Sequence, residues 1–196
     1  MNGITVWRAL RISVVLLVGC AILTGLIYPL VVLAIGRAIF GYRATGSIVS
    51  VNGKPVGSEL IGQKFERDEY FHPRPSAVDY DASKSGAADF GPTNGRYIDA
   101  VTRRAEALER KEGAKKGSIP VDLVTSSGSG LDPDITPAAA HLQAARVARA
   151  RGIPKSKVDS LIGEMTAPRT LGFLGENRVN VLLLNIELDK RFPSRK

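Results

Sequence analysis

The residues whose types and spacing could best support binding or catalysis form a short serine and glycine segment. Its members are Ser126, Ser127, Gly128, Ser129 and Gly130. Glycine-rich turns can cradle a phosphate with backbone N–H groups, but this segment lacks the lysine and the spacing of a P-loop. Backbone amides alone would have to hold a phosphate here. The other interpretation, which the bare pattern favours, is a tight structural turn.

Two histidines are the other candidates for chemistry. His72 stands in YFHPRPS and His141 in an alanine-rich stretch, far apart in the sequence. No serine lies in a G-x-S-x-G motif, so a hydrolytic triad is not indicated. The carboxylates near enough in sequence to join His72 at a metal ion are Asp68, Glu69 and Asp79. We expect packed or solvent-facing histidines, no catalytic residue and no metal site.

Two predicted elements flank the serine and glycine segment. Before it, the alternation in PVDLVT predicts a short strand over 121–125. After it, Thr136 as N-cap and Pro137 at the first helical position predict a helix over 137–151 that ends before a glycine. The many alanines of this helix predict a packing face. Gln143 lies within it and is either exposed or hydrogen-bonded to a partner.

The remaining pattern mixes helices, strands and turns. Asn52-Gly53 between apolar alternations predicts a β-hairpin. Residues 61–95 are rich in Gly, Pro, Ser and Asp, and a compact domain seldom keeps such a loop without a functional or packing reason. Helices are predicted over 96–112 and 156–165, whereas 178–191 fits a helix or a strand.

A long uncharged stretch precedes this domain. From Ile12 to Gly36 no charged residue occurs, and at about 1.5 Å per residue such a helix spans a hydrocarbon core of about 30 Å. A cleaved signal peptide would have a shorter apolar region. A lipoprotein, whose lipobox here would be LVGC, normally turns polar after its cysteine. We therefore predict a short N-terminal segment over 1–11, a transmembrane helix over 12–36 and a soluble domain over 37–196.

The predicted fold class is α+β, with one N-terminal transmembrane helix followed by a single mixed soluble domain. Arginines stand on both sides of the span, but long downstream domains cross a membrane largely regardless of charge. We expect a cytoplasmic N-terminus and the soluble domain outside. Gly19, Ala21 and Gly25 form a small-residue strip that suits close helix packing, although small residues are common in membrane helices. Pro29 is a candidate kink.

Charge and cysteine content limit the partner classes. The net charge is +8 and the pI about 9.8. The basic residues are interleaved with acids, as in RRAEALERKEGAKK, without a basic stripe that carries aromatics. An anionic membrane surface is therefore a better partner than a nucleic acid. The single cysteine, Cys20, excludes an intrachain disulfide and a cysteine-based zinc cluster.

Six segments occur in order over nearly the whole soluble domain: GSELIGQ (57–63), YFHPRPSA (70–77), GPTN (91–94), IPVDLVTSSGSGLDPDITPAAA (119–140), RVARARG (146–152) and GFLGENRVNVLLLNIELD (172–189). Together they resemble the C subunit of the bacterial Kdp-type potassium-transporting P-type ATPase. The resemblance implies a small subunit in the bacterial inner membrane. Its partners would be a potassium-channel-like subunit, an ATPase subunit and a small single-helix subunit, which carry out potassium translocation and ATP hydrolysis.

The resemblance also implies a nucleotide role. The family is described as a catalytic chaperone that raises the ATP affinity of the ATPase subunit through a transient ternary complex, with residues 126–130 and Gln143 as contacts. A domain outside the membrane would be separated from ATP. The leading hypothesis is therefore a non-catalytic accessory subunit needed for assembly and stabilisation, without a cofactor except ATP reached through the partner subunit. A third hypothesis, a membrane-anchored enzyme, rests only on the loop around His72.

Overall fold

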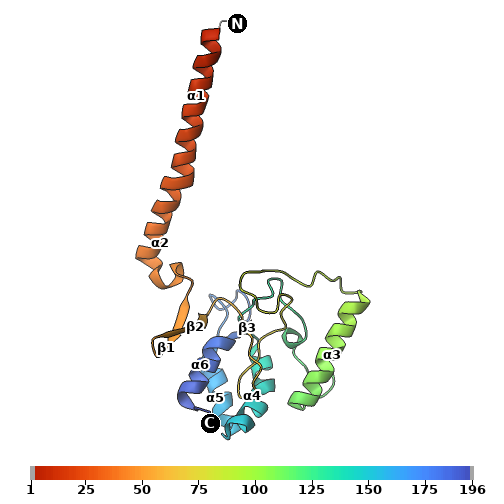
Figure 1. The fold of residues 1–196 in the computed structure, drawn as a ribbon. Helices are drawn as coiled ribbons and strands as arrows, with labels where there is room; N and C mark the ends of the chain where they lie inside the picture. Colours follow the sequence, from red (N-terminus) through yellow and green to blue (C-terminus); the bar gives the residue numbers. More distant parts are fainter. Residues whose placement is uncertain (1–2, 195–196) are drawn as a thin grey trace. The chain divides into compact units, whose positions relative to one another are not determined.

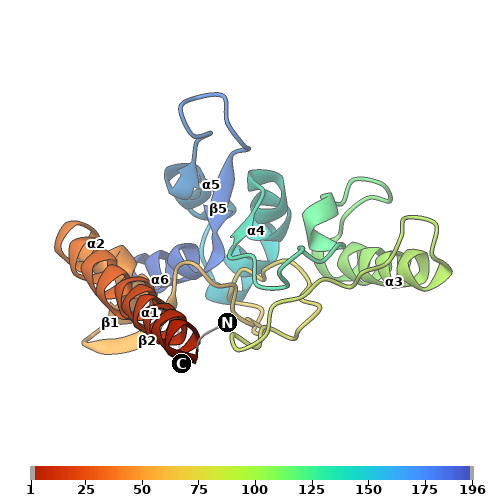
Figure 2. The same ribbon diagram turned by 90° about the horizontal axis from the view of Figure 1, so that it is seen from above.

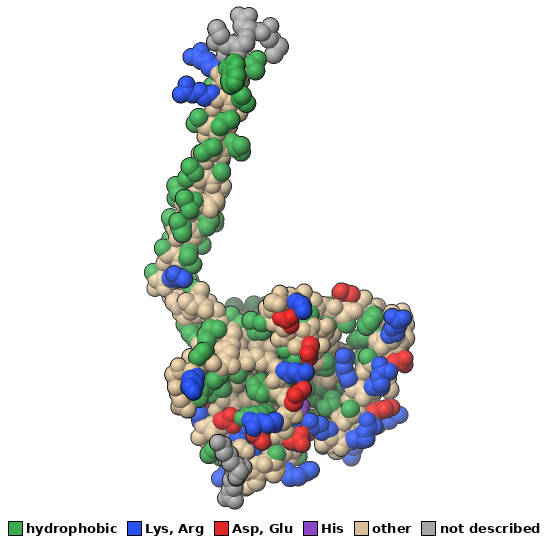
Figure 3. All heavy atoms as spheres, viewed as in Figure 1, with side chains coloured by type: hydrophobic (Ala, Val, Ile, Leu, Met, Phe, Trp, Pro, Cys, Tyr) green, Lys and Arg blue, Asp and Glu red, His purple; other side chains and the backbone are tan. Residues whose placement is uncertain are grey.

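The computed structural model describes residues 3–194 and divides the chain into two units, which meet between Ile48 and Val49 (Figure 1). The first unit is helical. It consists of α1 (Gly3–Ile22), a π-helical turn η1 (Leu23–Ile27) and α2 (Tyr28–Ala44). Apolar side chains cover the visible face of this helix in Figure 3. Within the described residues it is the one helix long and apolar enough to cross a membrane.

The π-helical turn explains how the helix accommodates Pro29. Proline lacks an N–H, and its ring clashes with the carbonyl four residues earlier in a regular α-helix. Here the pattern widens just before the proline, because the N–H of Tyr28 donates to the carbonyl of Leu23, five residues back. The helix continues to Ala44 and so extends beyond both ends of the predicted span 12–36.

The second unit is a mixed domain built on three C-terminal helices and a small sheet (Figures 1 and 2). The helices are α4 (Pro137–Arg151), α5 (Lys155–Met165) and α6 (Val181–Arg191). The strands are β3 (Asp134–Ile135), β4 (Thr166–Ala167) and β5 (Arg178–Asn180). β5 lies in the middle and pairs antiparallel with both neighbours, with Val179 opposite Ile135 on one side and Thr166 on the other. The predicted α+β class is confirmed.

The core lies where these helices meet the sheet. α4 packs on α5, and α5 on α6. Fully buried side chains form it, among them Ala140, Ala144 and Val147 of α4, Val158 and Ile162 of α5, Val179 of β5, and Leu184 and Leu188 of α6. Small side chains let neighbouring backbones approach closely, so the alanine face of α4 is a packing face as predicted.

Side chains and glycines cap α3 and α4, and the predicted caps of α4 are confirmed. α3 (Gly95–Glu112) begins after Asn94, whose side chain accepts two backbone N–H groups, and ends at Gly113 in the left-handed region. α4 begins after Thr136, whose hydroxyl accepts the N–H of Ala139, and ends at Gly152, also left-handed. These caps satisfy backbone groups that a helix end leaves free. α3 packs against α4.

The predicted hairpin is also present. β1 (Ile48–Val51) and β2 (Lys54–Ser58) pair across Asn52 and Gly53, whose φ angles of 52° and 75° suit a two-residue type I′ turn. Between β2 and α3 the described chain forms no helix or strand over residues 59–94. This segment is the predicted long loop.

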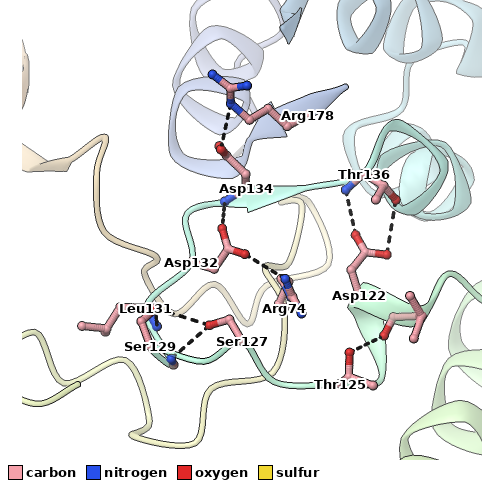
Figure 4. Close-up of polar contacts among 12 residues, drawn as sticks. Arg74, Asp122, Thr125, Ser127, Ser129, Leu131, Asp132, Asp134, Thr136 and Arg178 are labelled. Atoms are coloured by element: carbon pink, nitrogen blue, oxygen red, sulfur yellow. Dashed lines mark hydrogen bonds and ion pairs between the residues drawn. The ribbon is translucent and has the colours of Figure 1, made fainter. Parts of the chain in front are cut away.

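The predicted strand over 121–125 is wrong. The structure has a 3₁₀ turn there, η2 (Val121–Leu123), in which the carbonyl of Val121 accepts from two following N–H groups. The alternation misled because Asp122 is itself buried. Its carboxylate accepts the backbone N–H of Thr136 at 2.7 Å and the Thr136 hydroxyl at 3.2 Å, and so supports the start of α4 (Figure 4).

The ambiguous segment 178–191 contains both alternatives. β5 ends at Asn180, and α6 begins at the next residue. The Asn180 side chain accepts the N–H of Leu183 as an N-cap and donates to the carbonyl of Glu59 at 2.8 Å. One residue therefore ends the strand, starts the helix and fixes the beginning of the long loop.

Candidate functional site

The serine and glycine segment forms a compact turn whose hydroxyls brace its own backbone (Figure 4). The hydroxyl of Ser127 accepts the N–H of Gly130 at 3.0 Å, and the hydroxyl of Ser129 accepts the N–H of Leu131 at 3.1 Å. Backbone N–H groups are what a phosphate cradle offers. Two such N–H groups, those of Gly130 and Leu131, already donate to hydroxyls within the turn.

The same turn is tied to the long loop. The Ser76 hydroxyl donates to the carbonyl of Gly130 at 2.6 Å, and the N–H of Gly86 donates to the carbonyl of Ser129 at 2.9 Å. Gly130 has φ 68°, and a Cβ at this position would lie 2.9 Å from both the Gly86 carbonyl and Val78. Glycine is therefore required by conformation and by space.

Two aspartates after the turn form ion pairs (Figure 4). Asp132 accepts from Arg74 of the long loop at 2.8 Å and from the N–H of Asp134 at 3.0 Å. Arg178 of β5 lies 3.2 Å from Asp134. Burial, together with the negative charge of Asp132, raises the pKa of Asp134. These contacts join the loop, the turn and the sheet.

Gln143 is buried and hydrogen-bonded, which decides the alternative that the sequence left open. Its Oε1 accepts the N–H of His72 at 2.8 Å, and its Nε2 donates to the His72 carbonyl at 3.1 Å. The Nη2 of Arg146 donates to the same Oε1 at 2.8 Å. The bonds of Gln143 go to the long loop and its own helix, whereas the serine and glycine turn bonds to residues 76–86.

A second amide, Asn185 of α6, holds the neighbouring loop residue in the same way. Its Oδ1 accepts the N–H of Phe71 at 2.9 Å, and its Nδ2 donates to the Phe71 carbonyl at 3.0 Å. Phe71 itself is fully buried in the core. We call Gln143 and Asn185 the amide clamp, because each side chain satisfies both backbone groups of one loop residue. Sequence reasoning missed Asn185, although a lone amide in the apolar run VLLLNIEL was a signal.

Arg146 connects the clamp to α3. Its Nε lies 2.7 Å from Oε1 of Glu112, the last residue of α3, and both side chains are almost fully buried. Its Nη1 donates to the carbonyls of Asp68 and Tyr70 in the long loop. A buried arginine of this kind is stable because its charge is paired and its N–H groups are satisfied.

The histidines lie apart and in different surroundings. His72 borders a cavity of about 290 Å³ and has its Nε2 3.2 Å from the carbonyl of Arg67. Burial, aided by the positive charge of Arg146, lowers its pKa from 6.5 to about 4, so it is neutral at physiological pH. His141 is exposed and lies 2.9 Å from Asp159. Across residues 3–194, no group of three His, Cys, Asp or Glu side chains is placed to hold a metal ion.

The apolar N-terminal helix contains the predicted packing strip. Gly19, Ala21 and Gly25 are exposed, and a Cβ added at either glycine would meet open space. The strip as a contact for another helix stays a prediction.

The comparison with known proteins covers both units. A family model described as "K+-transporting ATPase, c chain" matches residues 10–190. The chain belongs to the KdpC family. The match includes most of the apolar helix, the serine and glycine turn and the amide clamp, so these features lie inside the part of the chain that KdpC proteins share.

Individual KdpC proteins match over almost their whole length. The potassium-transporting ATPase KdpC subunit of Rhodospirillum rubrum is 48% identical over 188 residues, which is 95% of this chain and 97% of that protein. The subunit of the same name from Variovorax paradoxus is 49% identical over 191 residues, 96% of this chain and 99% of that protein. That of Caldanaerobacter subterraneus is 45% identical over 195 residues, 99% of both chains. This chain is therefore a subunit of a potassium-transporting ATPase.

Proposed function

We propose that this chain is a non-catalytic accessory subunit that assembles and stabilises the potassium-transporting ATPase. The observation that carries the proposal is the state of the candidate nucleotide residues. Gln143 is 1% exposed, and its amide is bonded to His72 and Arg146. The hydroxyls of Ser127 and Ser129 accept neighbouring N–H groups. Side chains with these internal hydrogen bonds stabilise the domain and are not free to bind a ligand.

The proposed arrangement follows from the two units. The apolar helix sits in the bacterial inner membrane with the N-terminus in the cytoplasm, and the mixed domain lies outside. The helix contacts the potassium-channel-like subunit in the membrane, and the domain covers the external side of that subunit. The ATPase subunit hydrolyses ATP, and the small single-helix subunit completes the complex. The net charge of +8 suits the anionic lipid surface nearby.

Cysteine labelling tests the topology on which this proposal depends. The lone native cysteine lies within the apolar helix, so Cys20→Ser gives a clean background. In that background Lys116→Cys, at an exposed position of the domain, should react with a membrane-impermeant maleimide on intact cells. The matched variant Arg8→Cys should react only after permeabilisation. The reverse pattern would place the domain with ATP and would contradict the proposal.

The alternative function is a catalytic chaperone that raises the ATP affinity of the ATPase subunit. Its specific support is that Gly128 and Ser129 are exposed at the outer side of the turn, where a ligand could reach their backbone. Binding of a fluorescent ATP analogue to the full chain in mild detergent distinguishes the two functions. Saturable binding that Gly128→Pro abolishes, without a change in thermal stability, would favour the chaperone.

A further inference from the structure

The loop that connects β4 and β5 has an apolar tip, whose large side chains are exposed and do not pack in the core of the domain. In Figure 2 this connection projects away from the helices between α5 and β5. We call residues 170–175 the apolar tip. Leu171 is 79% exposed, Phe173 69% and Leu174 49%. Large apolar side chains gathered on one exposed loop mark an interaction site, whereas single exposed ones are normal.

The apolar tip is already folded. Thr170 and Leu174 exchange two backbone hydrogen bonds of 2.9 Å, and the N–H of Gly172 donates to the carbonyl of Arg169 at 3.0 Å. Because these groups are paired internally, the tip can leave water without stranding them. A preformed loop also loses little conformational entropy when it binds.

The turn at the tip contains two residues with a left-handed backbone. Leu171 has φ 54° and Gly172 φ 83°, both in the left-handed region. A leucine there costs of order 1 kcal/mol relative to glycine, and such strain clusters at binding sites. In this conformation Leu171 and Phe173 both remain in solvent.

The charges around the tip indicate a protein partner rather than a lipid surface. The exposed flanking residues carry both signs, with Arg169 on one side and Glu176 and Arg178 on the other. Arg178 is already paired with Asp134. A surface that binds an anionic membrane carries an excess of unpaired basic side chains, and the residues that flank the tip do not. Apolar anchors within a rim of mixed charge are typical of protein interfaces.

We propose that the apolar tip is the anchor by which the mixed domain docks into an apolar pocket, with a polar rim, on another subunit of the same complex. This inference rests on the proposed accessory function. Aromatic anchors at interface centres dominate affinity, so Phe173→Ala should weaken retention of the chain in the complex about 30-fold. The same variant should keep its thermal stability, because the removed atoms are in solvent.

Photo-crosslinking in the intact complex tests the docking surface. The full chain carries benzoylphenylalanine at position 173 or, as a matched control, at Val121, which is 68% exposed on η2. It is co-expressed with the other subunits, irradiated in native membranes and purified. The expected result is an adduct with another subunit from position 173 and none from position 121.

Other outcomes separate the docking surface from the accessory function. An adduct with lipid at position 173, no adduct there, or equal subunit adducts at both positions would overturn the tip as the anchor, while co-purification of the wild-type chain would keep the accessory function. A wild-type chain that purifies without the other subunits would overturn both.

Discussion

Replacing Gln143 by alanine tests whether this residue is part of the fold or part of a nucleotide site. The side chain of Gln143 is buried and bonds three protein groups at 2.8 to 3.1 Å, two on His72 and one on Arg146. Gln143→Ala leaves all three groups without that partner. The clamp on this part of the long loop is then reduced to Asn185 alone.

The expected loss of stability follows from those three groups. A buried polar group left unpaired costs about 1 to 3 kcal/mol, so the sum is roughly 3 to 9 kcal/mol if no water replaces the amide. His72 borders a cavity of about 290 Å³, which has the room and the polar groups to hold water. Water in this cavity can bond to some of the three groups, so we expect the free energy of unfolding to fall by a net amount of about 2 to 4 kcal/mol. In a domain of this size the Tm falls by about 5 to 15 °C.

The assay is thermal unfolding of the full chain in mild detergent, followed by near-ultraviolet circular dichroism of the aromatic residues. Arg149→Ala is the matched control, because Arg149 is exposed on the same helix. It should change stability by less than about 0.5 kcal/mol. If Gln143→Ala kept the wild-type Tm and yet removed the response of the complex to ATP, Gln143 would be a nucleotide contact and the structural argument would be refuted.

Three further predictions concern the loop and its supports. His72 has a pKa of about 4, below its ordinary 6.5, so the unfolded chain binds more protons between these values and stability should fall as the pH drops from 6.5 to 4; His72→Gln should flatten that slope in urea unfolding curves. Arg151→Ala should cost about 3 to 5 kcal/mol, measured by urea unfolding, because it leaves two backbone carbonyls without their partner. Asp189→Ala should cost only about 1 kcal/mol, because its carboxylate is 46% exposed and water can take its place beside Arg151. Gly62→Ala should lower the Tm by about 5 °C or more, because its Cβ would lie 2.5 Å from the carbonyl of Asp132.

The controls for these predictions come from the same chain. Gly113→Ala changes a left-handed helix cap in open space and should cost only about 1 kcal/mol. A larger loss at Gly113 than at Gly62 would contradict the close-packing argument. An unchanged acid slope in His72→Gln would show that other groups set it, and equal losses for Arg151→Ala and Asp189→Ala would show that the ion pair outweighs the two carbonyl contacts.

Elements with a local signal were predictable from the sequence. The N-cap Thr136 before Pro137, the helix stop at Gly152 and the Asn52-Gly53 turn each act through their own backbone preference, and each is confirmed. The strand over 121–125 failed because its decisive contact, between Asp122 and Thr136, joins residues 14 positions apart. A pattern of alternation carries no information about such a contact.

The site was predictable only in part, for the same reason. Gln143 was identified, but its role depends on His72, which is 71 residues away. Asn185 was missed because its partner, Phe71, is 114 residues away and bonds through its backbone. The exposure of Phe173 is equally invisible in the sequence, because the apolar residues of GFLG resemble those of VLLL further along, which are largely buried. Long-range contacts decide which polar residues are buried and which apolar ones are not.

The most direct test of the account is the integrity of the complex without this chain. The other subunits are expressed with and without it, extracted in mild detergent at saturating ATP, and analysed by co-purification. If this chain is an accessory subunit needed for assembly, the channel-like and ATPase subunits should separate without it, even at saturating ATP. A complex that stays intact and differs only in a higher KM for ATP would contradict the assembly function and establish the nucleotide role instead.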